Sequence, residues 1–300
     1  MSILIDRTTR VIAMGATGAE GSFWTGHMAA LGTQVVAAVT PGKEGESVGA
    51  IPVFHTVRRA VSAAGPVEGA MLFVPPRFTK DAVFECLDAG IRLIVTVADG
   101  IPLHDALQIR RAALSTGAKV IGGNTSGIIS PGKAMMGMFP YWIERVYKPG
   151  RIGVMTRSGS LTNEVTAMVV RAGFGVSTLV GVGGDPVPGL RFAEALALFE
   201  QDPETDAVVM IGELGGTMEE EAADMLASKA FSKPLAAFIG GRHAPEGRRM
   251  GHAGAITSGG VGGARYKMDR LRQAGALVAE RASQTGILLA EALHQNPENH

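Results

Sequence analysis

The chain has 300 residues, of which 46% are hydrophobic, and its 28 basic and 28 acidic residues give a formal net charge of zero. That length exceeds one typical domain and the apolar share supports sizeable cores, so we expect two domains. A zero net charge creates no overall field that attracts nucleic acid or a membrane surface, and we expect neither as a partner. The single cysteine, Cys86, excludes an intrachain disulfide and a cysteine-rich zinc site. We therefore interpret Cys86 as a small core residue and expect no metal site in this chain.

Along the chain, short apolar runs alternate with helical patterns. The N-terminal residues lack a signal-peptide layout and no apolar run reaches membrane-spanning length, which predicts a cytoplasmic protein. Apolar runs such as residues 10–14, 69–74 and 92–97 each precede a helix or glycine loop, which is typical of a parallel sheet covered by helices. The alternation pauses over residues 126–150 and then resumes. We predict an α/β fold with a Rossmann-like domain (1–130), a linker (131–150) and a flavodoxin-like, doubly wound domain (151–295).

The first predicted strand runs into a glycine loop, GATGAEG, that contains Gly15, Gly18 and Gly21. Glycines at a strand-to-helix turn let backbone N–H groups and the helix N-terminus approach a phosphate. The spacing differs from the dinucleotide fingerprint, so the loop alone does not identify its ligand. Lys43 follows the second predicted strand, where an NAD site carries an acidic residue. A cation there favours NADP or coenzyme A, which carry a phosphate on the ribose, although a solvated turn lysine explains the position equally well.

In the second predicted domain, distinctive residues follow the predicted strands. Ser158, Gly159 and Ser160 begin a helix, which is a typical anion site. Glu213 ends a later strand, and His252 lies in the glycine-rich loop after the next. Because the ends of parallel strands meet at one edge, Glu213 can reach His252 and make its other ring nitrogen a nucleophile. The combination indicates a phosphohistidine site, although each residue alone also fits an ordinary cap, ion pair or turn.

Further sequence motifs indicate which kinds of catalytic site this chain lacks. No G-x-x-x-x-G-K-[ST] motif is present, so we expect any nucleoside triphosphate to bind to another chain. The stretch RSGSL is not a G-x-S-x-G elbow, which argues against a serine hydrolase. The acidic run MEEEAADM, residues 218–225, is interpreted as a solvated first helical turn favoured by the helix dipole.

With GHAGAI, GGDP and GELGG in the second domain and TGAEG and TPGKEG in the first, nearly the whole chain resembles the α subunit of succinyl-CoA ligase (succinyl-CoA synthetase). The resemblance implies an NDP-forming acid–CoA ligase that works through an acyl phosphate and a phosphohistidine at His252, with Glu213 as the imidazole partner. It also implies an ATP-grasp β subunit that binds ATP or GTP with Mg²⁺, in a heterodimer or heterotetramer. The CoA contacts that it implies in the first domain are Thr17, Gly18, Ala19, Glu20, Lys43, Val97, Ala98 and Asp99.

The phosphoryl oxygens are expected to lie against Ser158–Ser160 and Gly183–Gly184. Asn163 departs from the succinate enzymes, whose SGTLTYE motif has a tyrosine there, and resembles ATP-citrate lyase and citryl-CoA synthetase. Residues 136–150 also exceed the usual link, as they do in the citrate enzymes. Because a short amide enlarges the pocket, we expect a small di- or tricarboxylic acid substrate, with malate and citrate as alternatives to succinate.

Two further functions stay open from the sequence. One is a CoA-binding scaffold without turnover, which would keep the first-domain site alone. The other is an NADP-dependent oxidoreductase, which relies on Lys43 and the glycine loop and leaves the His252 loop unexplained.

Overall fold

The computed structural model describes residues 2–244, 251–256 and 262–294, and it divides into two compact units. The first unit comprises Leu4–Phe139 with Val187–Leu190, and the second comprises Met1–Ile3, Pro140–Pro186 and Arg191–His300. The predicted linker therefore includes a short strand of the first unit and the first residues of the second. Residue 295, the predicted end of the second domain, lies outside the described residues.

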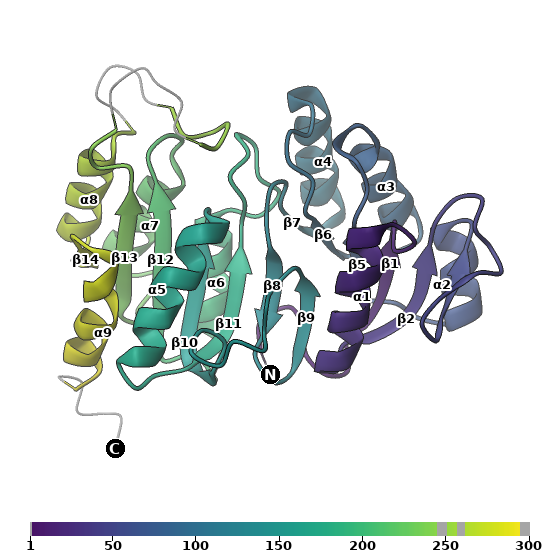
Figure 1. Cartoon of the computed structure of the whole chain (residues 1–300). Helices are drawn as coiled ribbons and strands as arrows, with labels where there is room; N and C mark the ends of the chain where they lie inside the picture. Colours follow the sequence, from purple (N-terminus) through teal and green to yellow (C-terminus); the bar gives the residue numbers. More distant parts are fainter. Residues whose placement is uncertain (1, 245–250, 257–261, 295–300) are drawn as a thin grey trace. The chain divides into compact units, whose positions relative to one another are not determined.

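The first unit is an α/β layer structure (Figure 1). Its elements are β1 (Arg10–Met14), α1 (Ala19–Leu31), β2 (Gln34–Val39), β3 (Ser47–Val48), β4 (Ile51–Phe54), α2 (Val57–Ala64), β5 (Gly69–Leu72), α3 (Pro76–Asp88), β6 (Leu93–Thr96), α4 (Leu103–Thr116), β7 (Lys119–Ile121), β8 (Gly127–Ser130) and β9 (Ala134–Gly137). Seven strands form a sheet in the order β3-β4-β2-β1-β5-β6-β7, parallel except for β3 against β4. The chain leaves β1 toward β2 and later returns to its other side as β5, so ligands are expected at the carboxyl ends of these strands.

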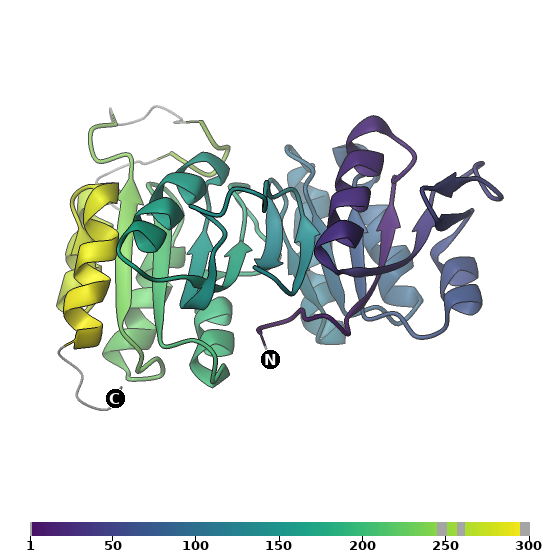
Figure 2. The same cartoon turned by 60° about the horizontal axis from the view of Figure 1, so that its bottom comes forward.

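Helices cover both faces of this sheet. The turned view places α1 on one face and α3 and α4 on the other (Figure 2). Local sequence sets several helix ends: Thr56 caps α2 by accepting the N–H of Arg59, Pro76 begins α3, and Gly32 ends α1 in a left-handed conformation. The β8–β9 hairpin is antiparallel, and the Thr33 hydroxyl donates to the backbone of Met135 at 2.8 Å.

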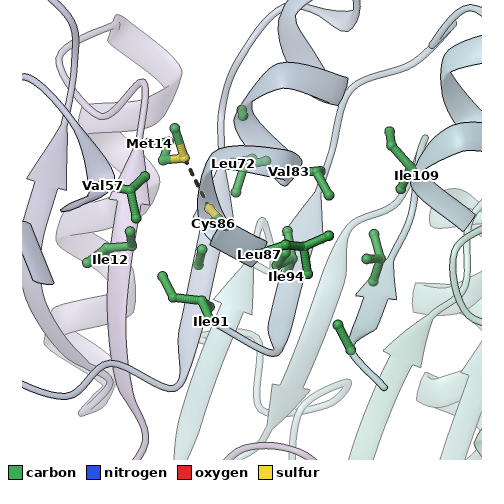
Figure 3. Close-up of a cluster of buried hydrophobic side chains, with 14 of the residues drawn as sticks. Ile12, Met14, Val57, Leu72, Val83, Cys86, Leu87, Ile91, Ile94 and Ile109 are labelled. Atoms are coloured by element: carbon green, nitrogen blue, oxygen red, sulfur yellow. Dashed lines mark hydrogen bonds between the residues drawn. The ribbon is translucent and has the colours of Figure 1, made fainter. Parts of the chain in front are cut away.

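The larger core of the first unit lies between the sheet and helices α2, α3 and α4. Ile12 and Met14 of β1, Leu72 of β5 and Val83 of α3 are buried in it (Figure 3). Cys86 also lies there, with its Sγ 3.5 Å from the Met14 sulfur, and burial raises the pKa of its thiol. The prediction that Cys86 is a core residue is confirmed.

The elements of the second unit are β10 (Pro149–Thr156), α5 (Gly159–Arg171), β11 (Val176–Gly181), α6 (Phe192–Gln201), β12 (Ala207–Glu213), α7 (Met218–Ala227), β13 (Leu235–Gly240), α8 (Ala264–Gln273), β14 (Leu277–Ala279), the 3₁₀ turn η1 (Ala282–Gln284) and α9 (Thr285–His294). Its strands are neighbours in the order β14-β13-β12-β10-β11 and run parallel to one another. Helices α5 and α9 pack together, while α6 packs on α7 and α7 on α8; α5 and α7 lie on opposite faces (Figures 1 and 2).

The predicted α/β fold class is confirmed: two mostly parallel sheets carry helices on their faces. Strand β12 is buried over its whole length, β10 is buried from Ile152 onward, and β13 is buried except for the half-buried Phe238 and Gly240, as expected for central strands of a parallel sheet covered on both sides. Within the part of the chain that the structure describes, no helix combines the length and apolarity needed to cross a membrane.

Candidate active site

A cavity of about 320 Å³ opens at the carboxyl edge of the second unit's sheet. Strand β12 ends at Glu213, β13 leads into the loop that carries His252, and β10 leads into α5 (Figure 1). The sheet therefore brings the ends of three strands to one edge, as the sequence predicts. The residues that line the cavity are Ser158, Ser160, Leu161, Glu213, Leu214, Gly240, Gly241, Gly251, His252 and Ala255.

Glu213 and His252 are in direct contact. The Nδ1 atom of His252 lies 2.7 Å from Oε2 of Glu213, and the two side chains are 24% and 11% exposed. A carboxylate oxygen accepts hydrogen bonds, so this contact is one in which Nδ1–H donates to Glu213. In a neutral imidazole, a proton on Nδ1 leaves the lone pair on Nε2, which is then the nitrogen that could act as a nucleophile.

The His252 ring lies directly on the backbone of Gly184. A Cβ at Gly184 would come within 2.5 Å of Cγ and Nδ1 of His252, so only glycine permits this approach. Gly254 donates its N–H to the Gly184 carbonyl at 3.3 Å, which ties the histidine loop to the loop after β11. Gly183 has a positive φ of 100°, a conformation that favours glycine. The predicted Gly183–Gly184 pair thus forms one wall beside the imidazole.

The N-terminus of α5 forms another wall. Ser158 is its N-cap and accepts the N–H of Leu161 at 3.4 Å, while Gly159 and Ser160 are exposed. The Ser158 and Ser160 hydroxyls lie 3.5 Å apart. The positive end of the helix dipole and these hydroxyls suit an anion at this position.

Asn163 lies one turn further along α5, on the face of Ser160; it is exposed and does not itself line the cavity. Its Oδ1 accepts a hydrogen bond of 2.5 Å from the Tyr147 hydroxyl. Tyr147 is 4% exposed, and burial raises the pKa of its phenol, so the hydroxyl stays protonated and acts as donor. Because Oδ1 accepts from Tyr147, the NH₂ group is the part of the Asn163 amide that can donate to a ligand.

Sequence reasoning missed three buried charged residues behind Glu213. Arg157, Glu219 and Lys267 have side chains that are 2%, 0% and 0% exposed. The interpretation of residues 218–225 as a solvated turn was wrong for Glu219, because α7 packs its first turn against β12 and α8. Arg157 stands at a strand end of the same edge, which was the available signal; nothing comparable marked Lys267.

In the first unit, glycines shape the loop between β1 and α1. A Cβ at Gly15 would meet the Phe73 carbonyl oxygen at 2.4 Å, and one at Gly21 would meet the Gly15 oxygen at 2.3 Å. Gly18 is the N-cap of α1 and no side chain caps this helix, so its first N–H groups face outward without a side-chain acceptor. Thr17 donates its hydroxyl to Thr40 at 3.2 Å. Ala19 and Glu20 are exposed in the first turn.

The other predicted CoA residues lie at the same edge. Lys43 is half-exposed and pairs with Glu46 at 2.8 Å. The Asp99 carboxylate accepts from the Asn124 amide at 3.0 Å, and the Ala98 carbonyl from the Asn124 N–H at 2.7 Å. A mainly apolar cavity of about 410 Å³ also opens there, and the predicted residues do not line it. Its lining residues are Met14, Gly15, Val39, Pro41, Val74, Pro75, Phe78, Asp81, Ala82 and Glu85.

Comparison with known families agrees with this division of the chain. Residues 6–100 match the model of the CoA binding domain, and residues 155–277 match that of the CoA-ligase. An ADP-forming sulfoacetate-CoA ligase subunit, SauD, of Bilophila wadsworthia is 66% identical, covering 98% of this chain and 100% of that protein. The subunit alpha 1 of an ADP-forming succinate–CoA ligase of Archaeoglobus fulgidus is 49% identical, over 93% and 94% of the two chains.

Among solved structures, ATP citrate lyase from Methanothrix soehngenii in complex with citrate and coenzyme A is similar, with a TM-score of 0.89 and 25% identity. The match covers 98% of this chain, which spans about half the length (51%) of that lyase chain. The chain belongs to the CoA-ligase family, together with the α subunits of succinate–CoA ligases. It is an acid–CoA ligase chain of the NDP-forming kind with a CoA-binding domain, and the predicted family is confirmed.

Proposed function

We propose that this chain is the α-type subunit of an ADP-forming sulfoacetate–CoA ligase, with His252 as the phosphoryl carrier. The contact of 2.7 Å between Glu213 and His252, seated on Gly184, carries the chemical part of this proposal. The likeness to SauD over the full length of both chains supports the substrate. The acid is therefore a sulfonated carboxylate, and succinate, malate and citrate become the competitors to be tested.

The proposed reaction runs in three transfers. First, Nε2 of His252 attacks the γ-phosphorus of ATP; the N–P bond forms, and the P–O bond to ADP breaks with its electrons leaving on ADP. Next, a carboxylate oxygen of sulfoacetate attacks the phosphorus, and the N–P bond breaks with its electron pair returning to Nε2. The acyl phosphate then reacts with the CoA thiolate at carbon, releasing phosphate. Each transfer is a displacement between oriented partners.

Residues around His252 have distinct parts in this scheme. Glu213 holds the proton on Nδ1 and stabilises the positive charge of the ring when Nε2 bonds phosphorus. The N-terminus of α5, with Ser158, Gly159 and Ser160, and the Gly183–Gly184 backbone would bind the phosphoryl oxygens. These donors belong to fixed backbone and a helix start, so they need little reorganisation during the transfer.

The first unit fits CoA, which supplies the thiol that accepts the acyl group. The uncapped N-terminus of α1 at Gly18, beside Thr17, Ala19 and Glu20, suits a pyrophosphate. Lys43 suits the phosphate on the ribose, and Val97–Asp99 form the neighbouring strand-end loop. An oxidoreductase is excluded by the family, and no contact among the described residues favours a scaffold without turnover over a ligase.

The nucleotide and Mg²⁺ are proposed to bind to a separate ATP-grasp β subunit, in a heterodimer or heterotetramer. Relatives named as subunits support a partner chain. The chain itself carries no P-loop motif. We further propose that the enzyme works in the cytoplasm, where ATP and CoA are available.

Asn163 and Tyr147 support an acid other than succinate. The Tyr147 phenol donates to Oδ1 of Asn163. The amide NH₂, with its two N–H groups, would then be the group that donates to an anionic head group bound beside Ser160. A sulfonate has three acceptor oxygens in a tetrahedral arrangement, so it needs more space and more donors than a planar carboxylate. The shorter asparagine supplies that space where succinate enzymes carry a tyrosine.

The proposal is tested by co-expressing the chain with its partner subunit and measuring thioester formation from ATP, CoA and each acid. We expect kcat/KM for sulfoacetate to exceed those for succinate, malate and citrate. A higher value for one of those three would replace sulfoacetate by that acid. CoA binding without any thioester would reject the ligase and favour the scaffold.

A further inference from the structure

A cluster of buried charges lies behind the Glu213–His252 pair. The Nη2 atom of Arg157 lies 3.3 Å from Oε1 of Glu213, as an ion pair in which this buried oxygen makes no hydrogen bond to a described residue, and Nη1 donates to Oε1 of Glu219 at 3.2 Å. Lys267 forms an ion pair with the other oxygen of Glu219 and lies 3.4 Å from Glu220. Arg157 therefore joins the carboxylate that contacts His252 to a second carboxylate that is completely buried.

The same side chains hold the backbone of the turn that follows Glu213. Glu219 accepts the N–H of Glu213 at 3.0 Å. Both Arg157 and Lys267 donate to the carbonyl of Gly215, at 2.8 and 2.7 Å. The turn is thus fixed at its beginning and at its end by charged groups from the residue after β10, from α7 and from α8.

Arg157 also reaches the histidine loop. A Cβ at Gly254 would lie 3.1 Å from Nη2 of Arg157, so the guanidinium packs against the backbone two residues after His252. One planar guanidinium contacts Glu213, Glu219 and the Gly215 carbonyl, which a lysine ammonium cannot reproduce in the same geometry. The Glu213 carboxylate and the backbone of the His252 loop therefore both lie against this side chain.

Buried ion pairs are weak evidence for stability, since their desolvation offsets most of the attraction. Because burying these charges costs desolvation free energy and adds little stability, we expect the cluster to serve the geometry of the neighbouring histidine. We propose that Arg157, held by Glu219 and Lys267, is a positioning residue that sets the Glu213 carboxylate against Nδ1 of His252. This inference rests on the proposed phosphoryl transfer at His252 and adds a residue that does not line the cavity.

The test uses the assembled enzyme and single-turnover phosphorylation of His252 by Mg-ATP, followed by intact mass. Arg157→Lys keeps the charge and loses the planar contacts; we expect phosphorylation about 10- to 100-fold slower, because small misplacements cost this much. The dissociation constant for CoA should stay unchanged. Glu219→Gln provides a second variant with the same expectation, in case Arg157→Lys does not fold.

A double-mutant cycle separates positioning from general structure. If Arg157 acts through Glu213, adding Arg157→Lys to a Glu213→Gln variant should lower the phosphorylation rate little further. If the two residues act independently, the fold-reductions in rate of the two single variants should multiply in the double variant. Arg191→Lys is the matched control, because Arg191 also pairs with α7, through Glu221, and among the described residues it forms no ion pair or hydrogen bond with Glu213. We expect its phosphorylation rate to match the wild type.

The outcomes separate this inference from the proposed function. If the wild-type chain takes no phosphoryl group, the proposed function fails first. If the wild type is phosphorylated and both Arg157→Lys and Glu219→Gln react at its rate, or the cycle with Glu213→Gln is multiplicative, Arg157 is not a positioning residue.

Discussion

The proposed phosphoryl transfer depends on His252. Because Nδ1 of its ring contacts Glu213, Nε2 is the ring nitrogen that is proposed to accept the phosphoryl group. The sequence predicted the two partners because the strand ends of a parallel sheet share an edge. It could not predict the stacking of the ring on Gly184, which depends on how two loops meet in space.

Replacing His252 by asparagine should abolish phosphorylation and leave the fold intact. Asparagine is polar and smaller, and the ring is partly exposed, so its removal leaves no deep cavity. The measurement is acid-labile phosphate on the isolated chain after incubation with Mg-ATP and the partner subunit. His104→Asn, an exposed position of α4, should label as the wild type does; full labelling of His252→Asn would place the phosphoryl group elsewhere.

The phenol of Tyr147 should influence the choice of acid through Asn163. Tyr147→Phe removes the donor to Oδ1 and frees the amide to rotate, so we expect KM for the acid to rise by up to about tenfold, the scale of one hydrogen bond. Steady-state kinetics with sulfoacetate and with CoA would check this, because KM for CoA should not change. Tyr141→Phe controls for the loss of a phenol, and an equal effect there would contradict the role of Tyr147.

Asn163→Tyr is expected to move preference toward succinate. The larger side chain reduces the space for a sulfonate and restores the residue found in succinate enzymes. The ratio of kcat/KM for succinate over sulfoacetate should increase at least several-fold, since lost fit in a pocket typically costs about 1–3 kcal/mol. Unchanged ratios across the acids would remove Asn163 as a determinant of specificity.

At the scale of elements, long apolar periodicities were predictable and short or polar elements were not. The strands β1, β6, β12 and β13 and helices α4 to α6 follow directly from apolar runs and helical spacing. The two-residue β3 and the polar α8 were not predicted, because neither contains enough apolar residues to give a recognisable strand or helix pattern. Lys267 sits on α8, so the buried charges behind Glu213 were missed with the helix that carries one of them.

Gly184, in the loop after β11, restricts the position of the His252 ring. Gly184→Ala would place a methyl group within 2.5 Å of the imidazole and displace it. We expect His252 phosphorylation to slow by about 100-fold, because a shift near 1 Å can cost this much. Rapid-quench labelling would measure the phosphorylation rate. A rate equal to that of the wild type would show that the position of the ring does not depend on its contact with Gly184.

Gly26 offers the opposite case inside α1. A Cβ there meets nothing within 4 Å, and the residue is exposed. Alanine should therefore raise the free energy of unfolding by about 0.5–1 kcal/mol, since glycine costs that much within a helix. Thermal unfolding would detect the increase, while a lower Tm would reveal a contact of Gly26 outside this chain.

At the scale of the whole molecule, two α/β units each present loops at the carboxyl ends of their strands. Family membership places CoA on the first unit. The proposed phosphoryl chemistry lies on the second, and the nucleotide on a partner. The chain alone should therefore bind CoA but form no thioester from ATP and any acid. Isothermal titration and a thioester assay on the isolated chain check this, and turnover without the partner would contradict it.

The most direct measurement tests the phosphorylation of His252 and the choice of acid in one experiment. The chain, assembled with its partner subunit, is phosphorylated with Mg-ATP, freed of nucleotide and then mixed with CoA and one acid at a time, with the mass of the chain followed. We predict that the wild type gains one phosphoryl group at His252 and loses it fastest with sulfoacetate plus CoA. A chain that never gains the group, or keeps it with sulfoacetate while another acid discharges it, would contradict the account.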